Sequence, residues 1–312
     1  MKCSLGRITV SALLIAAPLS GASAADMPLK APPPPPAPVY SWTGFYAGVN
    51  AGYGWGSSDA HPAGTNTSPC IPFPFGFCGT PIQPIIVSGG VASALAIPPV
   101  LSPNARGGLL GGTIGYNQQF GRWVAGLEAD LAWTRIVGSD TRGGGAGWVA
   151  PLSFNSTATA SNQLRDFGTL RARLGFTPVA PLLIYATGGL AYGRVSSNVQ
   201  VGEAIVPTGN CIALFGTCNG TPAIGGSSST RTGWTVGGGA EYLFAGQWSL
   251  KAEYLYYDLG STSYGLTPIT NLGLPGSPFI TAAVTSSSSD FRGSVVRVGL
   301  NYKFGYSPVV TK

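Results

Sequence analysis

The feature that most constrains this chain is a two-residue alternation of apolar with small or polar residues, which recurs in eight segments. It is clearest in the last segment, whose apolar parity consists of Val296, Val298, Leu300, Tyr302 and Phe304. Successive side chains of a β-strand point to opposite faces, so such a segment has one apolar face and one mostly polar face. The eight segments are residues 42–56, 106–120, 123–134, 164–177, 182–194, 230–244, 248–258 and 295–304. The pattern predicts an all-β fold.

The connections between these segments alternate strictly between short and long. The short ones are residues 121–122, 178–181 and 245–247. The long ones, rich in Gly, Ser, Thr and Pro, are residues 57–105, 135–163, 195–229 and 259–290. A transmembrane barrel has short periplasmic turns and long external loops, whereas a secreted β-sandwich has no reason to alternate loop length by side. We therefore predict an eight-stranded antiparallel transmembrane β-barrel at residues 42–305.

The N-terminus has the pattern of an export signal. Lys2 and Arg7 precede an apolar stretch at residues 8–19, and the small residues Ala22-Ser23-Ala24 form a cleavage site. Residues 1–25 are therefore predicted to be a signal peptide. The proline-rich residues 26–41 are expected to form an extended periplasmic spacer, and residues 306–312 a C-terminal tail.

Composition favours a membrane location and argues against nucleic-acid binding. The mean hydropathy is +0.24, only 9% of residues are charged, and no later window has 18 consecutive apolar residues. Without Lys2 and Arg7, the 17 Lys and Arg residues become 15 against 11 acids, a net charge of about +4. These basic residues are scattered and form no patch of the kind that binds nucleic acid. We expect outer-membrane lipid and lipopolysaccharide as the surroundings.

Charges of both signs occupy the polar parity of the segments, while the apolar parity has essentially none at mid-strand. A Lys or Arg that faces lipid at the bilayer midplane costs about 2–4 kcal/mol, so these charges should point inward. The predicted lumen ion-pair network is Glu128, Asp130, Arg165, Arg171, Arg173, Glu241, Lys251, Glu253 and Arg297. Eight strands enclose a lumen just wide enough for side chains, which favours a filled lumen. A narrow porin that passes small solutes or ions is the alternative.

Aromatic residues of the apolar parity gather at the segment ends. Near the short turns and the chain end they are Phe45, Phe120, Trp123, Phe176, Phe244, Trp248, Tyr302 and Phe304. Near the long loops they include Trp55, Trp133 and Trp234. Trp and Tyr concentrate at both membrane–water interfaces, so the two groups predict two aromatic belts.

Four cysteines remain once Cys3 is removed with the signal: Cys70, Cys78, Cys211 and Cys218. An even count in an oxidising compartment favours disulfides, and four cysteines allow three connectivities. We favour the local pairs Cys70–Cys78 and Cys211–Cys218, because each closes a small loop. A four-cysteine zinc site would need tighter spacing within each pair.

Residues that could carry enzyme chemistry are scarce. The one histidine, His61, lies in the first long connection with no partner at a spacing typical of catalysis or metal binding. The glycine clusters, such as Gly237-Gly238-Gly239, are not followed by the amphipathic helix that a phosphate loop needs. We predict no enzymatic activity, no cofactor and no metal.

Three segments resemble a known family. They are SWTGFYAGVNAGYGWG at residues 41–56, WVAGLEADLAW at 123–133 and VRVGLNYKF at 296–304. They are similar to the small outer-membrane β-barrel proteins of alphaproteobacteria, surface antigens often labelled porin-like. Together with other strand segments, the resemblance covers nearly all of residues 42–304 outside the long loops. It implies a role in envelope integrity and surface contact, with peptidoglycan or a host surface as candidate partners.

The final segment also resembles the C-terminal signal that the outer-membrane assembly machinery reads. The residues that carry this resemblance are Arg297, Gly299, Tyr302 and Phe304. Family members commonly end at the final Phe, whereas eight further residues follow Phe304 here. The signal is therefore expected to be internal.

Overall fold

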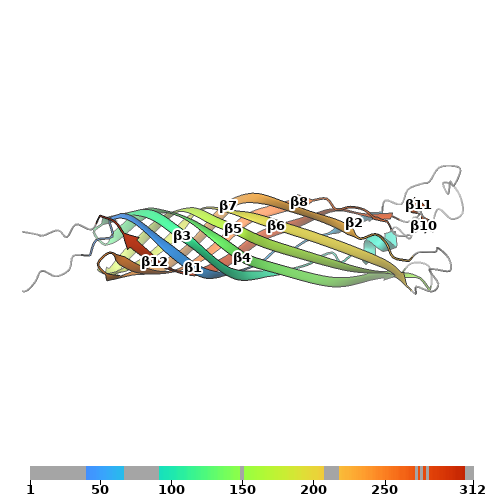
Figure 1. Cartoon of the computed structure of the whole chain (residues 1–312), viewed down its shortest axis with the longest axis horizontal. Coiled ribbons are helices and arrows are strands. Elements are labelled where there is room, and N and C mark those ends of the chain that lie inside the picture. The colour runs from blue at the N-terminus through green and yellow to red at the C-terminus, as the bar shows by residue number, and fades with distance from the viewer. Residues whose placement is uncertain are drawn as a thin grey trace, which may run out of the picture. The chain divides into compact units, whose positions relative to one another are not determined.

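Eight long antiparallel strands form a closed ring (Figure 1). The structure, a computed structural model, describes residues 40–66, 91–147, 151–206, 218–270, 273–274, 277–278 and 281–305. The long strands are β1 (Gly44–Ser57), β3 (Asn104–Phe120), β4 (Trp123–Gly147), β5 (Ser153–Val179), β6 (Leu182–Val206), β7 (Ala223–Ala245), β8 (Trp248–Tyr264) and β12 (Thr281–Lys303). Each pairs with its neighbour in this order, and β12 returns to pair with β1 from Tyr46↔Lys303 to Ser57↔Arg292. The predicted fold class is confirmed.

Short elements lie at the end of the barrel opposite the tight turns. β2 (Ala63–Asn66) and β9 (Ile269–Thr270) each pair with the first part of β12, and β10 (Gly273–Leu274) pairs with β11 (Ser277–Pro278). Residues 91–96 form a short helix. Within the described ranges, no helix is long and apolar enough to cross a membrane.

Tight turns join the strands at the other end. β3 meets β4 at Gly121-Arg122, and β7 meets β8 at Gly246-Gln247. Gly121 and Gly246 have φ values of 62° and 59°, a left-handed conformation that glycine adopts without steric cost. β5 and β6 are joined through Ala180-Pro181. These positions agree with the short connections that the sequence predicts.

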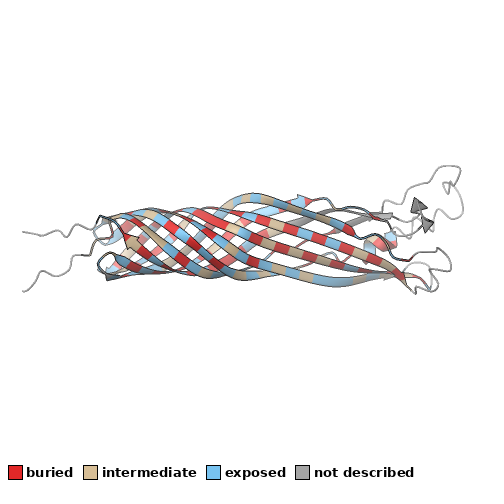
Figure 2. Ribbon diagram, in the orientation of Figure 1, coloured by how far each residue is buried: buried red, intermediate tan, exposed pale blue. Residues whose placement is uncertain are grey.

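Alternate residues of each strand are buried inside the ring and exposed outside it (Figure 2). On β12, Val296, Val298 and Leu300 are exposed to the exterior, whereas Arg297 and Asn301 are buried. The exterior is apolar because this band of the barrel faces lipid, so the usual soluble pattern is inverted.

The strands run further than the sequence indicates. We expected residues 135–163 and 195–229 to be loops, but their described parts are largely strand, since β4, β5, β6 and β7 extend into them. In this outer part Val199 and Val201 point inward and are buried, while Asn198 and Gln200 are exposed. The polarity of the two faces has switched because the surroundings are water instead of lipid. The apolar parity in the sequence therefore stops before these strands end, and it predicts strands that are too short.

A β-bulge on β5 changes which parity faces inward. Between Leu164 and Asp166 the strand has one residue more than β6, which pairs Val195 with Leu164 and the adjacent Arg194 with Asp166. Even-numbered residues up to Leu164 point inward, and odd-numbered residues do so from Phe167 onward. An extra residue in one strand displaces every later side chain to the other face.

Two adjacent glycines on β3 test the close packing of the barrel wall. Gly111 faces the lumen, and a Cβ there would lie 2.7 Å from the Cβ of Ala132, whereas a Cβ on the lipid-facing Gly112 would meet only the Gly48 carbonyl oxygen at 3.8 Å. We expect Gly111→Ala to lower the free energy of unfolding by about 1–3 kcal/mol through overpacking. Gly112→Ala is the matched control and should change it by less than about 0.5 kcal/mol. Urea unfolding of the refolded barrel, read from the gel shift between unheated and boiled samples, measures both; equal losses would contradict the packing.

The disulfide prediction is tested by peptide mapping. Cys218 is disulfide-bonded, whereas Cys70, Cys78 and Cys211 lie outside the described residues. Mass spectrometry of a non-reduced digest should recover Cys70–Cys78 and Cys211–Cys218 peptides. Free thiols or a Cys70–Cys211 link would refute this pairing.

Candidate functional site in the barrel lumen

Charged side chains from five strands meet inside the barrel. Four carboxylates and four cations form this lumen network within the described residues: Glu128 and Asp130 on β4, Arg171 and Arg173 on β5, Glu241 on β7, Lys251 and Glu253 on β8, and Arg297 on β12. Every one of them is 5% exposed or less. The opposite charges balance, which is the condition under which ions persist away from water.

Arg171 joins three of the carboxylates. Its Nη1 donates to Glu253 Oε1 at 2.8 Å, and its Nη2 donates to Asp130 Oδ2 at 3.0 Å and to a Glu128 oxygen. Its Nε donates to the Thr169 hydroxyl at 2.8 Å. Every guanidinium nitrogen therefore has a partner, so removing this side chain would leave several buried acceptors without a donor.

Arg297 and Lys251 complete the centre of the network. Arg297 donates through Nε to Glu253 Oε2 at 2.7 Å and through Nη2 to Asp130 Oδ2 at 2.9 Å. Lys251 Nζ lies 2.9 Å and 3.0 Å from the two oxygens of Glu128. Arg297 Nη2 also lies 3.6 Å from Glu128 Oε1. Glu128 of β4 is therefore bound by cations of β8 and β12 as well as of its neighbour β5, which ties opposite walls of the barrel together.

A second pair lies beside this centre. Arg173 Nη2 donates to Glu241 Oε2 at 2.8 Å, and its Nη1 donates to the Tyr46 hydroxyl at 2.9 Å. The guanidinium carbon is also 4.0 Å from the centroid of the Tyr185 ring, a cation–π contact. Glu241 in turn accepts from Ser249 at 2.6 Å and from Asn301 at 2.8 Å.

Sequence reasoning missed the two lumen tyrosines, Tyr46 and Tyr185. The Tyr46 hydroxyl donates to Glu128 Oε2 at 2.7 Å, and the Tyr185 hydroxyl donates to Glu253 Oε1 at 3.1 Å. Each ring fills the space above a glycine of the adjacent strand, Gly115 for Tyr46 and Gly239 for Tyr185. The sequence pattern that could have identified these two tyrosines is an aromatic residue on the inward parity of one strand, with a glycine on the neighbouring strand.

The prediction that Arg165 belongs to the lumen network is wrong. Its side chain is exposed, and its Nε donates to Gln163 Oε1 at 3.3 Å. Arg165 has the same parity as Arg171 and Arg173 in the sequence. The bulge between Leu164 and Asp166 turns it outward.

Apolar layers close the lumen on both sides of the network. On the turn side, Trp42 is 2% exposed and packs with Val124, Leu183, Tyr185 and Leu243. The Trp42 indole donates to the Ala180 carbonyl at 3.2 Å, and its backbone N–H donates to Gln119 at 2.8 Å.

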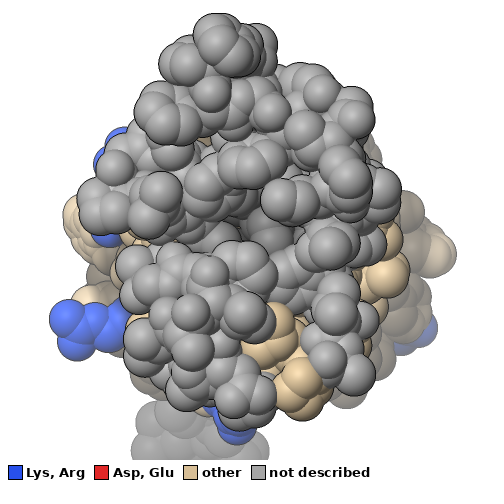
Figure 3. All heavy atoms as spheres, turned by 90° about the vertical axis from the view of Figure 1, so that its right-hand side faces the viewer, with Lys and Arg blue, Asp and Glu red and all other residues tan. Residues whose placement is uncertain are grey.

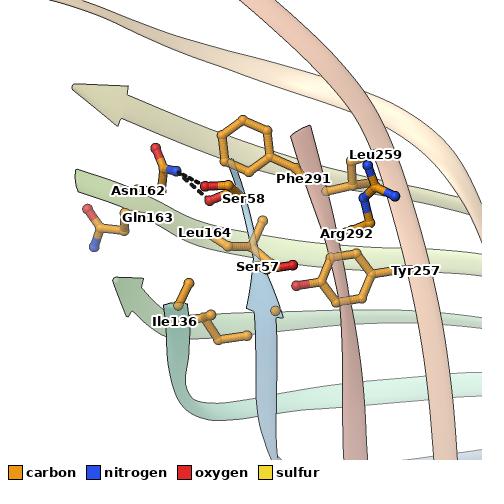
Figure 4. Close-up of a pocket in the computed structure, with 12 residues that line it drawn as sticks. Ser57, Ser58, Ile136, Asn162, Gln163, Leu164, Tyr257, Leu259, Phe291 and Arg292 are labelled. Atoms are coloured by element: carbon orange, nitrogen blue, oxygen red, sulfur yellow. Dashed lines mark hydrogen bonds between the residues drawn. The ribbon is translucent and has the colours of Figure 1, made fainter. Parts of the chain in front are cut away.

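The outer apolar layer is larger. It includes Leu109, Ile136, Leu164, Phe167, Leu255, Tyr257, Leu259, Phe291 and Val295. The space left within it is a cavity of about 20 Å³, which holds about one water molecule (Figure 4). Asn162 at its margin donates to the carbonyl and hydroxyl oxygens of Ser58. The described lumen is therefore packed rather than open at this level.

Aromatic side chains surround the exterior at the two heights that the sequence indicated. Near the turns, Trp123 packs against Phe176 with ring centroids 5.5 Å apart, and Tyr302 contacts both Trp248 and Phe304 at 5.0 and 5.2 Å. Phe45, Phe120 and Phe244 are exposed at the same level. Toward the loops, Trp55, Trp133 and Trp234 are exposed on the exterior. Their anchoring of the barrel at the membrane interfaces stays a prediction.

Residues with metal-binding chemistry do not gather in the described part of the chain. No group of three or more His, Cys, Asp and Glu residues there could hold an ion, and His61 is an exposed residue just beyond β1. The lumen network contains equal numbers of cations and anions, so its carboxylates already have partners.

The geometry, a closed eight-strand ring with a lipid-facing apolar exterior, agrees with the comparisons. The outer membrane protein β-barrel domain model matches residues 12–304. The chain belongs to the outer-membrane β-barrel protein family. It is 33% identical over 290 residues to the 31 kDa outer-membrane immunogenic protein of Brucella melitensis, covering 91% of this chain and 94% of the relative.

A second Brucella relative is consistent with this family. The 25 kDa outer-membrane immunogenic protein of Brucella canis is 25% identical, covering 97% of this chain and all of the relative. Among solved structures, outer membrane protein OprG of Pseudomonas aeruginosa is 13% identical with a TM-score of 0.37, covering 86% of this chain and 99% of that one. The predicted family and the outer-membrane location in a Gram-negative bacterium are confirmed.

Arg171 provides the direct test of the lumen network. Arg171→Leu removes the donor to Glu128, Asp130 and Glu253, and we expect it to lower the free energy of unfolding by about 3–5 kcal/mol because buried charges lose their partner. Arg165→Leu, on the same strand but exposed, should change it by less than about 0.5 kcal/mol. Urea titration monitored by intrinsic fluorescence in detergent micelles measures both. Equal stability of Arg171→Leu and wild type would show that Arg171 is solvated.

Proposed function

We propose that this protein is a structural barrel with a filled, non-conducting lumen, which supports the envelope and presents a surface outside the cell. The observation that carries the proposal is the closed sequence of layers in the lumen. Trp42 and its neighbours lie on the turn side, the lumen network lies at mid-barrel, and the layer around Phe167 and Tyr257 lies beyond it. A solute would have to displace all three.

The ion pairs themselves favour a structural role over a selectivity filter. A filter must bind an ion weakly enough to release it and needs charges that face an aqueous path. Here the side chains of Arg171, Glu253 and Asp130 are each 0% exposed, and their hydrogen-bonding groups are directed at one another. This mutual pairing stabilises the barrel wall. Among the polar side-chain atoms of these three residues, only Asp130 Oδ1 has no hydrogen-bond partner in the described part of the chain, and that atom is buried.

Two other observations support the parts of the proposal that concern surface presentation and the lack of enzymatic activity. The relatives from Brucella are named outer-membrane immunogenic proteins, which is the kind of name that a surface-exposed, non-enzymatic barrel receives. Extension of β4, β5 and β6 well past the length needed to cross a bilayer gives this barrel a large outer portion. We extend the proposal to assembly as well: Arg297, Gly299, Tyr302 and Phe304 would serve as the insertion signal.

Conductance measurements test the filled lumen. Purified wild-type barrel in planar lipid bilayers should give no stable channel steps, because ions cannot cross the packed layers. If a current does appear, its path must be identified. The Glu253→Gln variant is therefore recorded in parallel under the same conditions, because it changes a charge inside the lumen. Reproducible wild-type channels whose conductance changes in Glu253→Gln would show ions passing through the lumen and would favour a narrow porin.

A further inference from the structure

A groove with both aromatic and cationic walls lies on the outside of the barrel, toward its outer end. It is lined by Tyr53 and Trp55 of β1, Arg106 of β3, Tyr256 of β8 and Arg292 of β12, and its volume is about 670 Å³. The three aromatic residues lie at the height of the outer belt. The groove is thus placed where lipid headgroups meet the barrel.

Strand register explains why the groove forms. Trp55 is opposite Arg106 on one side, and Ser57, two residues further on, is opposite Arg292 on the other. The two arginines therefore flank β1, two strand spacings apart across the sheet and two residues apart along it, which places their Cα atoms roughly 12 Å from each other. Apart from Trp55, the lining residues near the two arginines are mostly small, among them Gly56, Ser57 and Gly293, which leaves the floor low.

Two arginines of this region have no side-chain partner among the described residues. Arg106 and Arg135 of β4 make no ion pair or side-chain hydrogen bond with any residue that the structure describes. Arg135 lies close by, because Arg106 is paired with Val137 two positions further along the same face. Arg292 pairs with Asp290 at 2.9 Å through Nη2 and is opposite Asp258. Figure 3, which looks onto the outer end, shows Lys and Arg atoms at several points of the rim.

Below this cationic region the lipid-facing wall is hollowed. A furrow of about 890 Å³ runs across β1, β3 and β4 as far as Leu170 of β5 and Tyr192 of β6. It is lined mostly by apolar and small residues, among them Val49, Leu110, Gly112, Ile114 and Trp133. It is open at Gly112, where a Cβ would lie 3.8 Å from the nearest atom, the Gly48 carbonyl oxygen. An acyl chain, straight and apolar, is the kind of ligand that such a furrow fits.

We propose that this face binds one molecule of a phosphorylated glycolipid of the outer leaflet. Arg106, Arg135 and Arg292 hold its phosphate groups, since guanidinium groups bind phosphate oxygens in bidentate geometry. The rings of Trp55 and Tyr53 pack against its sugar and upper chain, as amphipathic rings do at a membrane interface. One acyl chain occupies the furrow at Gly112. This site is independent of the lumen and does not depend on whether the lumen conducts.

Native mass spectrometry of the refolded full chain in a zwitterionic detergent tests the proposal. The probes are bisphosphorylated lipid A, the same lipid without phosphates, and inorganic phosphate. Wild type should retain one bisphosphorylated molecule, and the affinity should fall about tenfold for each of Arg106→Ala and Arg135→Ala, the loss expected for one charge-assisted hydrogen bond. Arg142→Ala, on β4 but further from the membrane, is the matched control and should bind as wild type does.

A second pair of variants tests the furrow. Gly112→Leu should weaken binding of lipid A because its side chain fills the acyl groove, while the gel shift between unheated and boiled samples stays intact. Gly188→Leu on β6, where a Cβ meets the Thr235 carbonyl oxygen at 3.5 Å, is the control and should leave binding unchanged.

Five outcomes would overturn the proposal. The first three are equal binding of the phosphate-free lipid, equal loss in Arg142→Ala, and unchanged binding in Gly112→Leu. The fourth is a wild-type dimer that Gly112→Leu dissociates, because the face would then be an interface between two copies. Binding of inorganic phosphate as tight as that of lipid A would show an anion site without lipid recognition and would likewise contradict it.

Discussion

Mutual neutralisation of buried charges is the constraint on which the rest of this barrel depends. Glu128, as one example, is in contact with Arg171, Arg173 and Lys251, which come from two different strands. Each charge is stable away from water only because the others are present, so the wall of the barrel is fixed by side chains as well as by backbone ladders. The tyrosines and the facing glycines belong to the same arrangement, because the long side chains need the space that glycine leaves.

The surroundings of the wall change from lipid to water along its axis, and the side chains change with them. In the membrane band the exterior is apolar and the lumen is charged. Further out, Val199 and Val201 turn inward while Asn198 and Gln200 face water, as in a soluble sheet. The apolar layer around Phe167 and Tyr257 lies in the lumen between these regions. The cationic groove of Arg106 and Arg292 lies on the exterior of the barrel, toward its outer end. One strand pattern thus serves a lipid-facing anchor, a filled interior and a polar outer surface.

The sequence predicted the ring, the tight turns and most of the lumen charges, because these follow from parity and from the cost of charge in lipid. Arg171, Arg173 and Arg297 lie together inside, but Arg165 does not, since no local pattern signals the bulge before Asp166. The outer strand extensions were missed because their polarity is inverted relative to the membrane band. The packed layer was missed for a related reason: residues such as Val295 and Leu255 lie on the parity that we expected to be polar.

A double-mutant cycle on Arg173 and Glu241 tests the central claim most directly. Their side chains are 2.8 Å apart and both are buried, so each single change, Arg173→Met or Glu241→Gln, should leave the other partner unsatisfied. We predict that the double variant is more stable than the sum of the single losses implies, with a coupling of at least about 1.5 kcal/mol. Additive losses within about 0.5 kcal/mol would contradict an interior held together by its charges.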